Sequence, residues 1–179
     1  MIHIISQLKD LYGMSIYQTA FLSLRWSICP FLEMEKLIPP EGTILDVGCG
    51  IGIFSNLLSL SSSSRNVIGI DISENKIKIA SATIKNRTNI KFIKGDIHSI
   101  ETNDIHGIVM SDFLHHLPYN IQQRILNKLG KRLKENGVLL IKEIDPDAGM
   151  RFLMSALSDK LLYPRDKCFF IKQKDLTKY

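Results

Sequence analysis

The sequence is poor in cysteine and has no long apolar run. Its three cysteines, Cys29, Cys49 and Cys168, are odd in number and far apart. They show no metal-ligand pair spacing, so we expect neither a disulfide framework nor a zinc site, and we predict no metal. No apolar run approaches the roughly 18 residues that span a bilayer, and the N-terminus lacks a basic leader. We therefore expect a soluble, cytoplasmic protein.

Glycine, proline and charge are present in ordinary amounts. The 179 residues include 11 Gly and 6 Pro and are 45% hydrophobic and 23% charged, which excludes disordered and fibrous classes. The net charge is +5, but the basic residues are scattered among predicted helices, as is usual for solvated faces. We expect no nucleic-acid partner, and a polyanionic partner remains the alternative.

Short runs rich in β-branched residues alternate with segments of helical period. The predicted strands are Thr43–Val47, Asn66–Asp71, Ile90–Lys94, Gly107–Ser111 and Val138–Ile144. Ser73 suits the N-cap of a helix after the second strand, and Pro118 suits the start of another. The apolar face of that later helix is Ile121, Ile125, Leu129 and Leu133, and the helix should end before the turn "KENG", residues 134–137. This alternation predicts an α/β fold with a parallel sheet.

The stretch "ILDVGCGIG", from Ile44 to Gly52, links the first strand to a helix with Phe54, Leu57 and Leu58 facing inward. Glycines there permit a tight turn and close approach of a ligand to the backbone. The stretch could also be a turn that binds nothing. A dinucleotide loop has the spacing G-x-G-x-x-G, which differs from this one, and Asp46 would repel a pyrophosphate. A cationic ligand would be attracted, and S-adenosylmethionine (AdoMet) carries an ammonium and a sulfonium but no phosphate.

Over roughly Leu32 to Asp145 the sequence resembles the class I AdoMet-dependent methyltransferases, in particular their small-molecule branch. The resemblance implies a Rossmann-like, doubly wound, mainly parallel sheet of strand order 3-2-1-4-5 with an N-terminal helical cap. The family's first motif, whose loop backbone lies against the methionine part of AdoMet, matches at Asp46, Gly48, Cys49, Gly50 and Gly52.

Further motifs follow in the family's order. The resemblance assigns Asp71 to both ribose hydroxyls and Ile72 to the side of the adenine. It places Asp96 at the adenine amino group and Ile97 on the ring. The stretch from Ser111 to Pro118, "SDFLHHLP", resembles the fourth motif, where cofactor and acceptor meet. Asp71 could instead cap the next helix, and Asp96 could be an ordinary turn aspartate. We expect a solvated Asp71 carboxylate, so that its removal changes stability little.

The reaction that the resemblance implies is direct displacement at the methyl carbon of AdoMet, which requires mainly alignment of the reactants. An oxygen or nitrogen acceptor also needs a base. His115 is our candidate catalytic residue, with His116 as the neighbouring alternative, because imidazole titrates near neutral pH. Glu143 and Asp145 are further candidates. Cys49 is better explained as a small residue in a tight loop than as a catalytic thiol.

We predict one methyltransferase domain over 1–179, with a helical cap over 1–30, a cofactor-binding core over 31–145 and a C-terminal helical segment over 146–179. In the cap, Tyr12, Tyr17 and Trp26 either line the acceptor pocket or pack in the core. The C-terminal segment contains a helical pattern through Met150, Leu153, Leu157 and Leu161.

The resemblance implies last strands that have no counterpart before Tyr179, so we expect an exposed sheet edge through which a homo-oligomer could form. Either the chain is a truncated form, or a partner or the C-terminal tail covers that edge. We expect a small, hydrophobic or lipid-like acceptor. The alternative is a cofactor-binding module that is inactive or regulatory.

Overall fold

A computed structural model describes residues 2–12, 26, 29–97, 102–149, 152–153 and 168–171. The chain divides into two compact units. The first comprises Met1–Val109 and Arg132–Leu140, and the second comprises Met110–Lys131 and Ile141–Tyr179. Among the described residues, no helix is both long and apolar enough to cross a membrane.

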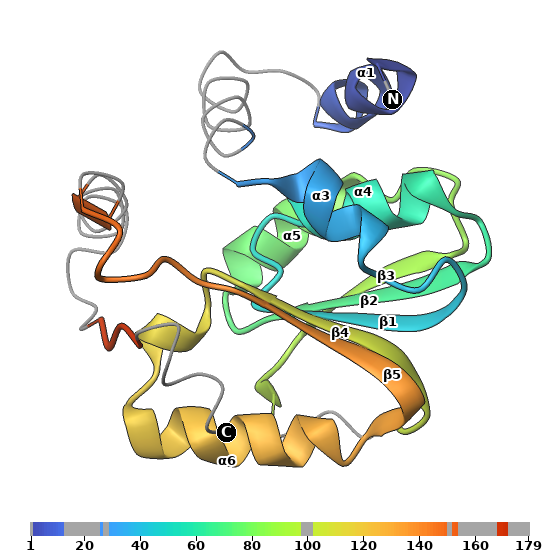
Figure 1. The fold of residues 1–179 in the computed structure, drawn as a ribbon. Coiled ribbons are helices and arrows are strands. Elements are labelled where there is room, and N and C mark those ends of the chain that lie inside the picture. The colour runs from blue at the N-terminus through green and yellow to red at the C-terminus, as the bar shows by residue number, and fades with distance from the viewer. Residues whose placement is uncertain are drawn as a thin grey trace. The chain divides into compact units, whose positions relative to one another are not determined.

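The strands form one five-stranded parallel sheet in the order β3-β2-β1-β4-β5, which confirms the predicted order (Figure 1). Their bounds are β1 Gly42–Val47, β2 Arg65–Asp71, β3 Ile90–Lys94, β4 Ile105–Ser111 and β5 Leu133–Lys142. Ile44 pairs with Val67 and Val67 pairs with Ile90. The central strands β1, β2 and β4 are buried along most of their length, as their apolar sequences predict.

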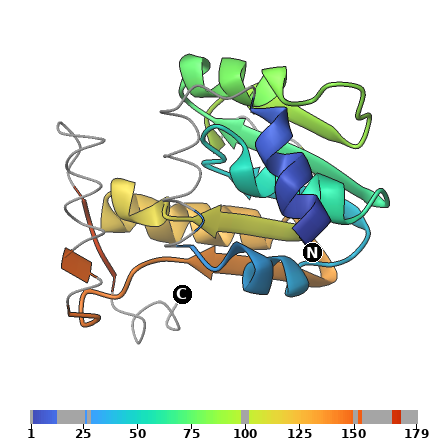
Figure 2. The same cartoon turned by 90° about the horizontal axis from the view of Figure 1, so that it is seen from above.

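Helices cover one face of the first unit's part of the sheet (Figure 1). The helices α4 (Ile53–Ser61) and α5 (Glu74–Ala82) pack on β2 and β3. The helices α1 (Ile2–Leu11) and α3 (Phe31–Lys36) pack on α4, and Figure 2 shows α1 lying across it. The side chain of Ser73 accepts a hydrogen bond from Lys76 N at 3.4 Å, which confirms the predicted N-cap of α5.

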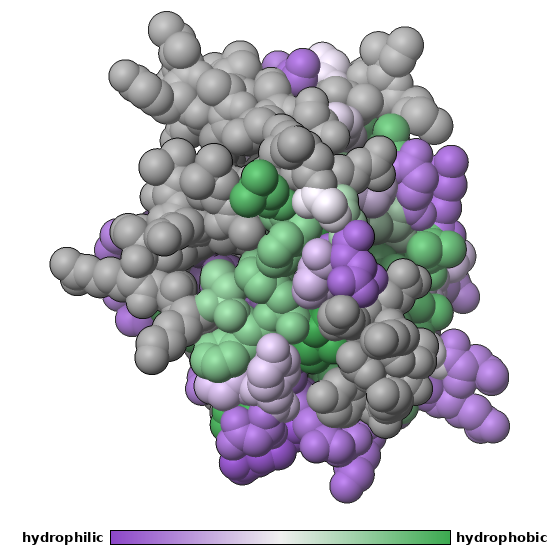
Figure 3. Space-filling view, turned by 60° about the vertical axis from the view of Figure 1, so that its left-hand side comes forward, coloured by the Kyte–Doolittle hydropathy of each residue, from purple (hydrophilic) through white to green (hydrophobic). Residues whose placement is uncertain are grey.

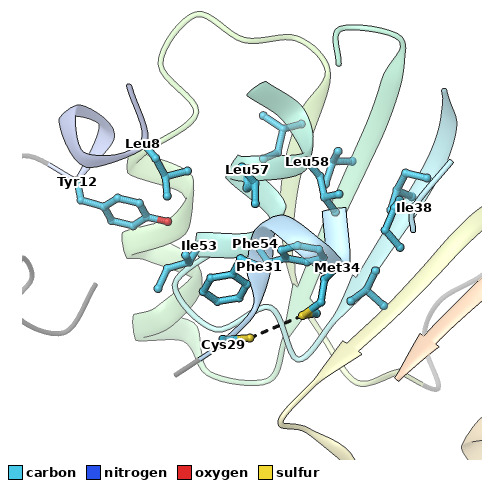
Figure 4. Packing of buried hydrophobic residues seen from close by; sticks show 14 residues of the cluster. Leu8, Tyr12, Cys29, Phe31, Met34, Ile38, Ile53, Phe54, Leu57 and Leu58 are labelled. Carbon is cyan, nitrogen blue, oxygen red and sulfur yellow. Dashed lines mark hydrogen bonds between the residues drawn. The ribbon is translucent and has the colours of Figure 1, made fainter. Parts of the chain in front are cut away.

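The core of the first unit lies between these helices and the sheet (Figure 4). Leu57 and Leu58 of α4 are fully buried, as the helical spacing predicts. The ring of Phe31 stacks on Phe54 with 5.6 Å between centroids, and Trp26 packs on Phe31 at 5.4 Å. Trp26 therefore packs in the core, which was one of the two alternatives for it, and Tyr17 lies outside the described residues.

The aromatic ring of Phe92, on β3, occupies space that two glycines leave open. A Cβ added to Gly69 on β2 would lie 2.6 Å from Phe92 Cδ1, and one added to Gly52 would lie 2.6 Å from Phe92 Cζ. Real Cβ atoms do not approach carbon this closely. The glycine at each position is therefore required by the ring beside it, in addition to any requirement of the turn.

The boundary between the helix α6 and β5 differs from the prediction. The helix spans Tyr119–Gly130, with Pro118 at its N-cap as predicted, and β5 begins at Leu133. Leu133 was expected on the helix face, and "KENG" was expected as a turn before the strand. The turn residues instead lie inside β5, where Asn136 has a φ of 65°. The helical spacing of apolar residues simply continued past the point where the helix ended.

Apolar side chains also reach the surface. Figure 3 shows hydrophobic surface, in green, beside hydrophilic surface, in purple. The large apolar residues that are exposed among those described are Leu37, Ile72, Ile79, Ile93, Tyr119 and Leu153. Of the predicted C-terminal amphipathic helix, only residues 152–153 are described as helical, and the rest lies outside the described residues.

Candidate functional site

The glycine loop, which we define as Gly48–Gly52, connects β1 to α4. Gly48, Gly50 and Gly52 have φ angles of 71°, 58° and 83°. This left-handed conformation is costly for residues that carry a Cβ, so all three glycines are required by the backbone. The backbone N–H groups of Gly48 and Cys49 both donate to Ile70 O, at 2.9 and 3.0 Å, and hold the loop at the end of β2. A Cβ at Gly50 would meet nothing within 4 Å, so the loop is open on that side.

Asp71, the last residue of β2, fixes the glycine loop to the start of α5. Its Oδ2 accepts from Gly50 N at 2.9 Å, and its Oδ1 accepts from Ser73 N at 2.8 Å. The residue is buried. The expectation of a solvated carboxylate is therefore wrong, because two backbone donors replace water around it. A carboxylate has about four lone-pair sites, so Asp71 can still accept from a ligand.

Asp46, near the end of β1, is a buried carboxylate. Its relative exposure is 3%, and its Oδ2 accepts from Ser55 Oγ at 2.5 Å. Burial raises the pKa of Asp46 from 3.8 to about 6, against the lowering effect of Ser55. The cause is desolvation of the charged form. A cation bound nearby would favour the ionised form and reverse this shift.

Hydrogen bonds of the Tyr12 hydroxyl join the end of α1 to the glycine loop. The hydroxyl of Tyr12 donates to Ile51 O at 3.1 Å and accepts from Asn56 Nδ2 at 2.9 Å. Asn56 also donates to Thr83 Oγ1 at 2.8 Å. Tyr12 is thus a buried residue that supports the loop. No sequence pattern pointed to Asn56, since an asparagine in a helix gives no signal of its partners.

Cys49 lies within the glycine loop, and its thiol is unsuited to nucleophilic work. Burial, followed by the charges of Asp46 and Asp71, strongly raises the pKa of the Cys49 thiol. A thiol is nucleophilic as the thiolate, so the Cys49 side chain stays protonated near neutral pH. The interpretation of Cys49 as a small loop residue agrees with this.

The residues predicted to bind the adenine differ in exposure. Ile72 follows Asp71 and is 76% exposed, which is unusual for a large apolar side chain next to a strand end. Asp96 is also exposed, whereas Ile97 is buried at 6%. The Ile72 side chain therefore leaves most of its apolar surface open to solvent.

The second unit contains its own group of polar residues around the turn that follows β4. The 3-10 helix η2 spans Leu114–His116. Glu143 Oε1 accepts from Phe113 N at 2.9 Å and from Leu114 N at 2.7 Å, while its Oε2 pairs with His115 Nδ1 at 2.5 Å. Glu143 thus fixes both the turn and the orientation of the His115 ring. The sequence named both residues as candidates without predicting that they pair.

Next to this pair, sequence reasoning missed an ion pair. Lys142 Nζ lies 2.5 Å from Asp112 Oδ1, and Asp112 N donates to Lys142 O at 2.8 Å. Asp112 has a φ of 50°, a conformation that residues with a Cβ rarely adopt. The predicted strand order could have found this pair, because β4 and β5 are parallel neighbours whose carboxyl ends meet. Ser111, predicted as a cofactor residue, is half-buried at the end of β4.

Comparison with known proteins establishes the family. Residues 38–178 match the family model described as a methyltransferase domain. The chain belongs to this methyltransferase-domain family. The resemblance to class I AdoMet-dependent methyltransferases is thereby confirmed.

Individual relatives of this methyltransferase-domain chain are distant. It is 27% identical over 137 residues to malonyl-[acyl-carrier protein] O-methyltransferase 2 of Ilyobacter polytropus, covering 75% of this chain and 51% of that protein. It is 33% identical over 104 residues to the ubiquinone biosynthesis O-methyltransferase of Rickettsia prowazekii, covering 57% and 40%. The chain therefore spans about half the length of these curated relatives or less.

The solved structures support the same fold. A SAM-dependent methyltransferase from Archaeoglobus fulgidus superposes with a TM-score of 0.67 at 19% identity, covering 92% of this chain and 72% of that one. At this identity the similarity establishes the Rossmann-like fold of the methyltransferase-domain chain and nothing finer.

Proposed function

We propose that this chain binds AdoMet and transfers its methyl group to a small, hydrophobic or lipid-like acceptor. The observation that carries the proposal is the arrangement around the glycine loop: an open left-handed Gly50 between two buried carboxylates, Asp46 and Asp71. An open backbone loop beside two buried carboxylates suits a ligand that combines positive charge with vicinal hydroxyls.

The residues present fit AdoMet better than a dinucleotide. Gly48, Gly50 and Gly52 would hold its methionine part, and Asp46, whose ionisation a cation favours, would provide negative charge. Asp71 would accept from the ribose hydroxyls in addition to its two backbone donors. A pyrophosphate would instead add negative charge next to Asp46, which already resists ionisation.

The remaining cofactor residues in this proposal lie around the adenine and the acceptor. Ile72, Asp96 and Ile97 would surround the adenine, with Ile72 offering the most exposed apolar surface of the three. Cys49 and Ser111 complete the proposed set. Bound AdoMet supplies an activated methyl group on a sulfonium, so the protein is required mainly to align the acceptor and exclude water.

For a hydroxyl acceptor, we assign the role of general base to His115 in the metal-free chain. Glu143 would accept a hydrogen bond from Nδ1–H of His115. Nε2 is then the nitrogen that would take a proton from the acceptor. The named relatives act on malonyl-[acyl-carrier protein] and in ubiquinone biosynthesis, and both names favour an oxygen acceptor on a hydrophobic or carrier-bound molecule. A cytoplasmic location, a homo-oligomer formed through a sheet edge and the absence of a nucleic-acid partner belong to the same proposal.

Calorimetry and labelled methyl transfer test the proposal in two steps. The purified chain should bind AdoMet and S-adenosylhomocysteine with micromolar affinity and should not bind NAD. Binding of NAD comparable to that of AdoMet would contradict the assignment of the loop. Labelled AdoMet is then incubated with lipid and with polar metabolite extracts, and label should enter the lipid fraction. Tight binding without any transfer would favour the inactive, regulatory module instead.

A further inference from the structure

The second unit brings together three side chains that commonly bind metals. His115, His116 and Cys168 each offer one ligand atom, and these atoms all lie within 4.8 Å of one another. The imidazole rings of the two histidines are 4.3 Å apart between centroids. His115 Nε2 and His116 Nδ1 are buried from solvent. The residues come from two segments about 50 positions apart, so neither cysteine spacing nor a sequence motif could reveal the cluster.

A frame of hydrogen bonds holds the segment of Cys168 against the turn that carries the histidines. Phe169 N donates to His115 O at 2.6 Å, and Tyr119 Oη donates to Phe170 O at 3.1 Å. Gln122 Nε2 donates to both Phe169 O, at 3.0 Å, and Leu117 O, at 2.7 Å. The ring of Phe170 also stacks on that of His115 at 4.9 Å. The three ligand-bearing residues are therefore positioned by contacts that do not involve the ligand atoms.

The orientation of His115 is the second observation that points to a metal. Glu143 Oε2 lies 2.5 Å from His115 Nδ1, so Nε2 is the nitrogen directed away from the carboxylate. A histidine that binds a metal through one nitrogen usually donates the other N–H to a carboxylate or carbonyl, which fixes its tautomer and raises its basicity. Glu143 is itself fixed by two backbone N–H donors, so it can hold the ring rigidly.

We propose that His115, His116 and Cys168 bind a zinc ion. Tetrahedral zinc with bonds of about 2.0–2.1 Å to nitrogen and about 2.3 Å to sulfur places its ligand atoms roughly 3.3–3.6 Å apart. The ligand atoms lie within 4.8 Å of one another, so a contraction of at most about 1.5 Å brings them to these separations. The charges also balance, because the Cys168 thiolate and the Glu143 carboxylate together neutralise Zn²⁺. Three protein ligands leave a fourth position for water or an oxygen of a bound compound.

Zinc binding would change the role of His115. The same nitrogen cannot ligate zinc and accept a proton, so His115 would be a metal ligand in place of a general base. The zinc site does not depend on methyl transfer, because it is measured by metal binding alone. A chain that binds zinc but transfers no methyl group would refute only the proposed function, and the reverse result would refute only the zinc site.

The test uses the full chain without a histidine tag, purified under reducing conditions and without chelator. Elemental analysis should find close to one zinc ion per chain. After removal of the metal, titration with Co²⁺ should produce the intense visible bands of tetrahedral cobalt and a near-ultraviolet band from thiolate-to-cobalt charge transfer. A folded wild-type chain that takes up neither metal, or a cobalt complex without the thiolate band, would overturn the proposal.

Variants assign the ligands. Cys168→Ala should remove the charge-transfer band, whereas Cys29→Ala, which deletes a buried thiol of the first unit, should leave it unchanged. Glu143→Gln should weaken zinc binding by about 10–100-fold, as is typical of residues that orient a ligand. Circular dichroism of each metal-free variant controls for folding. Retention of the band in Cys168→Ala, or its loss in Cys29→Ala, would contradict the assignment.

Discussion

The glycine loop and the histidine cluster are built in opposite ways. In the first, Asp46, Asp71 and the glycines lie at or next to the ends of adjacent strands, and the Asp71 carboxylate accepts from two backbone N–H groups. In the second, His115, Glu143 and Cys168 come from three separate segments, and side chains contact one another. The comparison shows that a candidate site made by contiguous residues can be predicted from sequence, whereas one made by tertiary contacts becomes visible only in the structure.

The largest loss of stability should follow substitution of Gly52, which has a left-handed backbone and also packs against the Phe92 ring. Gly52→Ala places a Cβ 2.6 Å from Phe92 in a left-handed residue, and we expect a loss of about 2–5 kcal/mol in the free energy of unfolding. Gly50→Ala, with open space around it, should lose only about 1–2 kcal/mol. Urea unfolding of both variants measures the difference. Equal losses would show that packing against Phe92 contributes nothing.

Asp71 should affect both stability and ligand binding. Asp71→Ala leaves the part-buried N–H groups of Gly50 and Ser73 without their acceptor, at a total cost of about 1–3 kcal/mol. AdoMet affinity should also fall by at least about tenfold, which corresponds to 1.4 kcal/mol. Melting temperature and calorimetry of the same variant separate the two effects. A variant of normal affinity per folded molecule would exclude a ligand role.

The raised pKa of Asp46 predicts that the stability of the chain depends on pH. Its pKa in the folded chain, about 6, lies above the usual 3.8, so the folded state binds the proton more tightly. The stability that Asp46 contributes is therefore complete below about pH 3.8 and is lost as the pH rises through about 6. Asp46→Asn should be more stable than the wild type above pH 6, by on the order of 1–3 kcal/mol.

Urea unfolding of Asp46→Asn and wild type at about pH 5 and about pH 8 checks this sign, because the difference isolates one group. AdoMet affinity should change in the opposite direction. The wild type should bind more weakly as the pH falls below about 6, and Asp46→Asn should bind weakly throughout. A stability difference that does not depend on pH would refute the assignment.

The proposed zinc site can be weakened by a substitution that leaves His115, His116 and Cys168 in place. Gln122→Leu removes the hydrogen bond to Phe169 O, which helps to hold the segment of Cys168, and the one to Leu117 O, next to the histidines. We expect a loss of about 1–3 kcal/mol in stability. Zinc affinity should fall as well, while AdoMet affinity stays unchanged. Tyr119→Phe, which removes one bond at the surface, serves as the milder control. Unchanged zinc binding in Gln122→Leu would show that the frame is not needed.

The smallest effect is expected at the exposed edge of the loop site. Ile72→Ala should change stability by less than about 0.5 kcal/mol, because the side chain is largely in solvent. If Ile72 lies beside the adenine, AdoMet affinity should fall several-fold. Leu37→Ala, also an exposed apolar residue, is the matched control and should bind normally. A similar change in both variants would count against a specific contact.

The strands of the sheet were predicted well because each strand is marked by its own short run of residues. Buried parallel strands are short β-branched runs, so four of the five strands were predicted within about two residues of their observed starts. The start of β5 was missed because Leu133 continued a helical spacing beyond Gly130. Among the candidate site residues, the glycines and Asp46 were named from a contiguous motif, and their role in binding stays a prediction. The burial of Asp71, the pairing of Asp112 with Lys142 and the position of Cys168 depend on contacts between distant segments.

The packing of Phe92 over Gly52 and Gly69 has a consequence for how this sequence can diverge. One aromatic ring fills the space above two glycines on separate elements, so the three positions form an epistatic set. A lineage that first replaces Phe92 with a smaller residue opens a cavity and loses stability. Alanine can then replace Gly69 without a steric clash. A lineage that acquires the alanine first meets a steric clash. Divergence at these positions is therefore ordered in time, and the aromatic position has to change first.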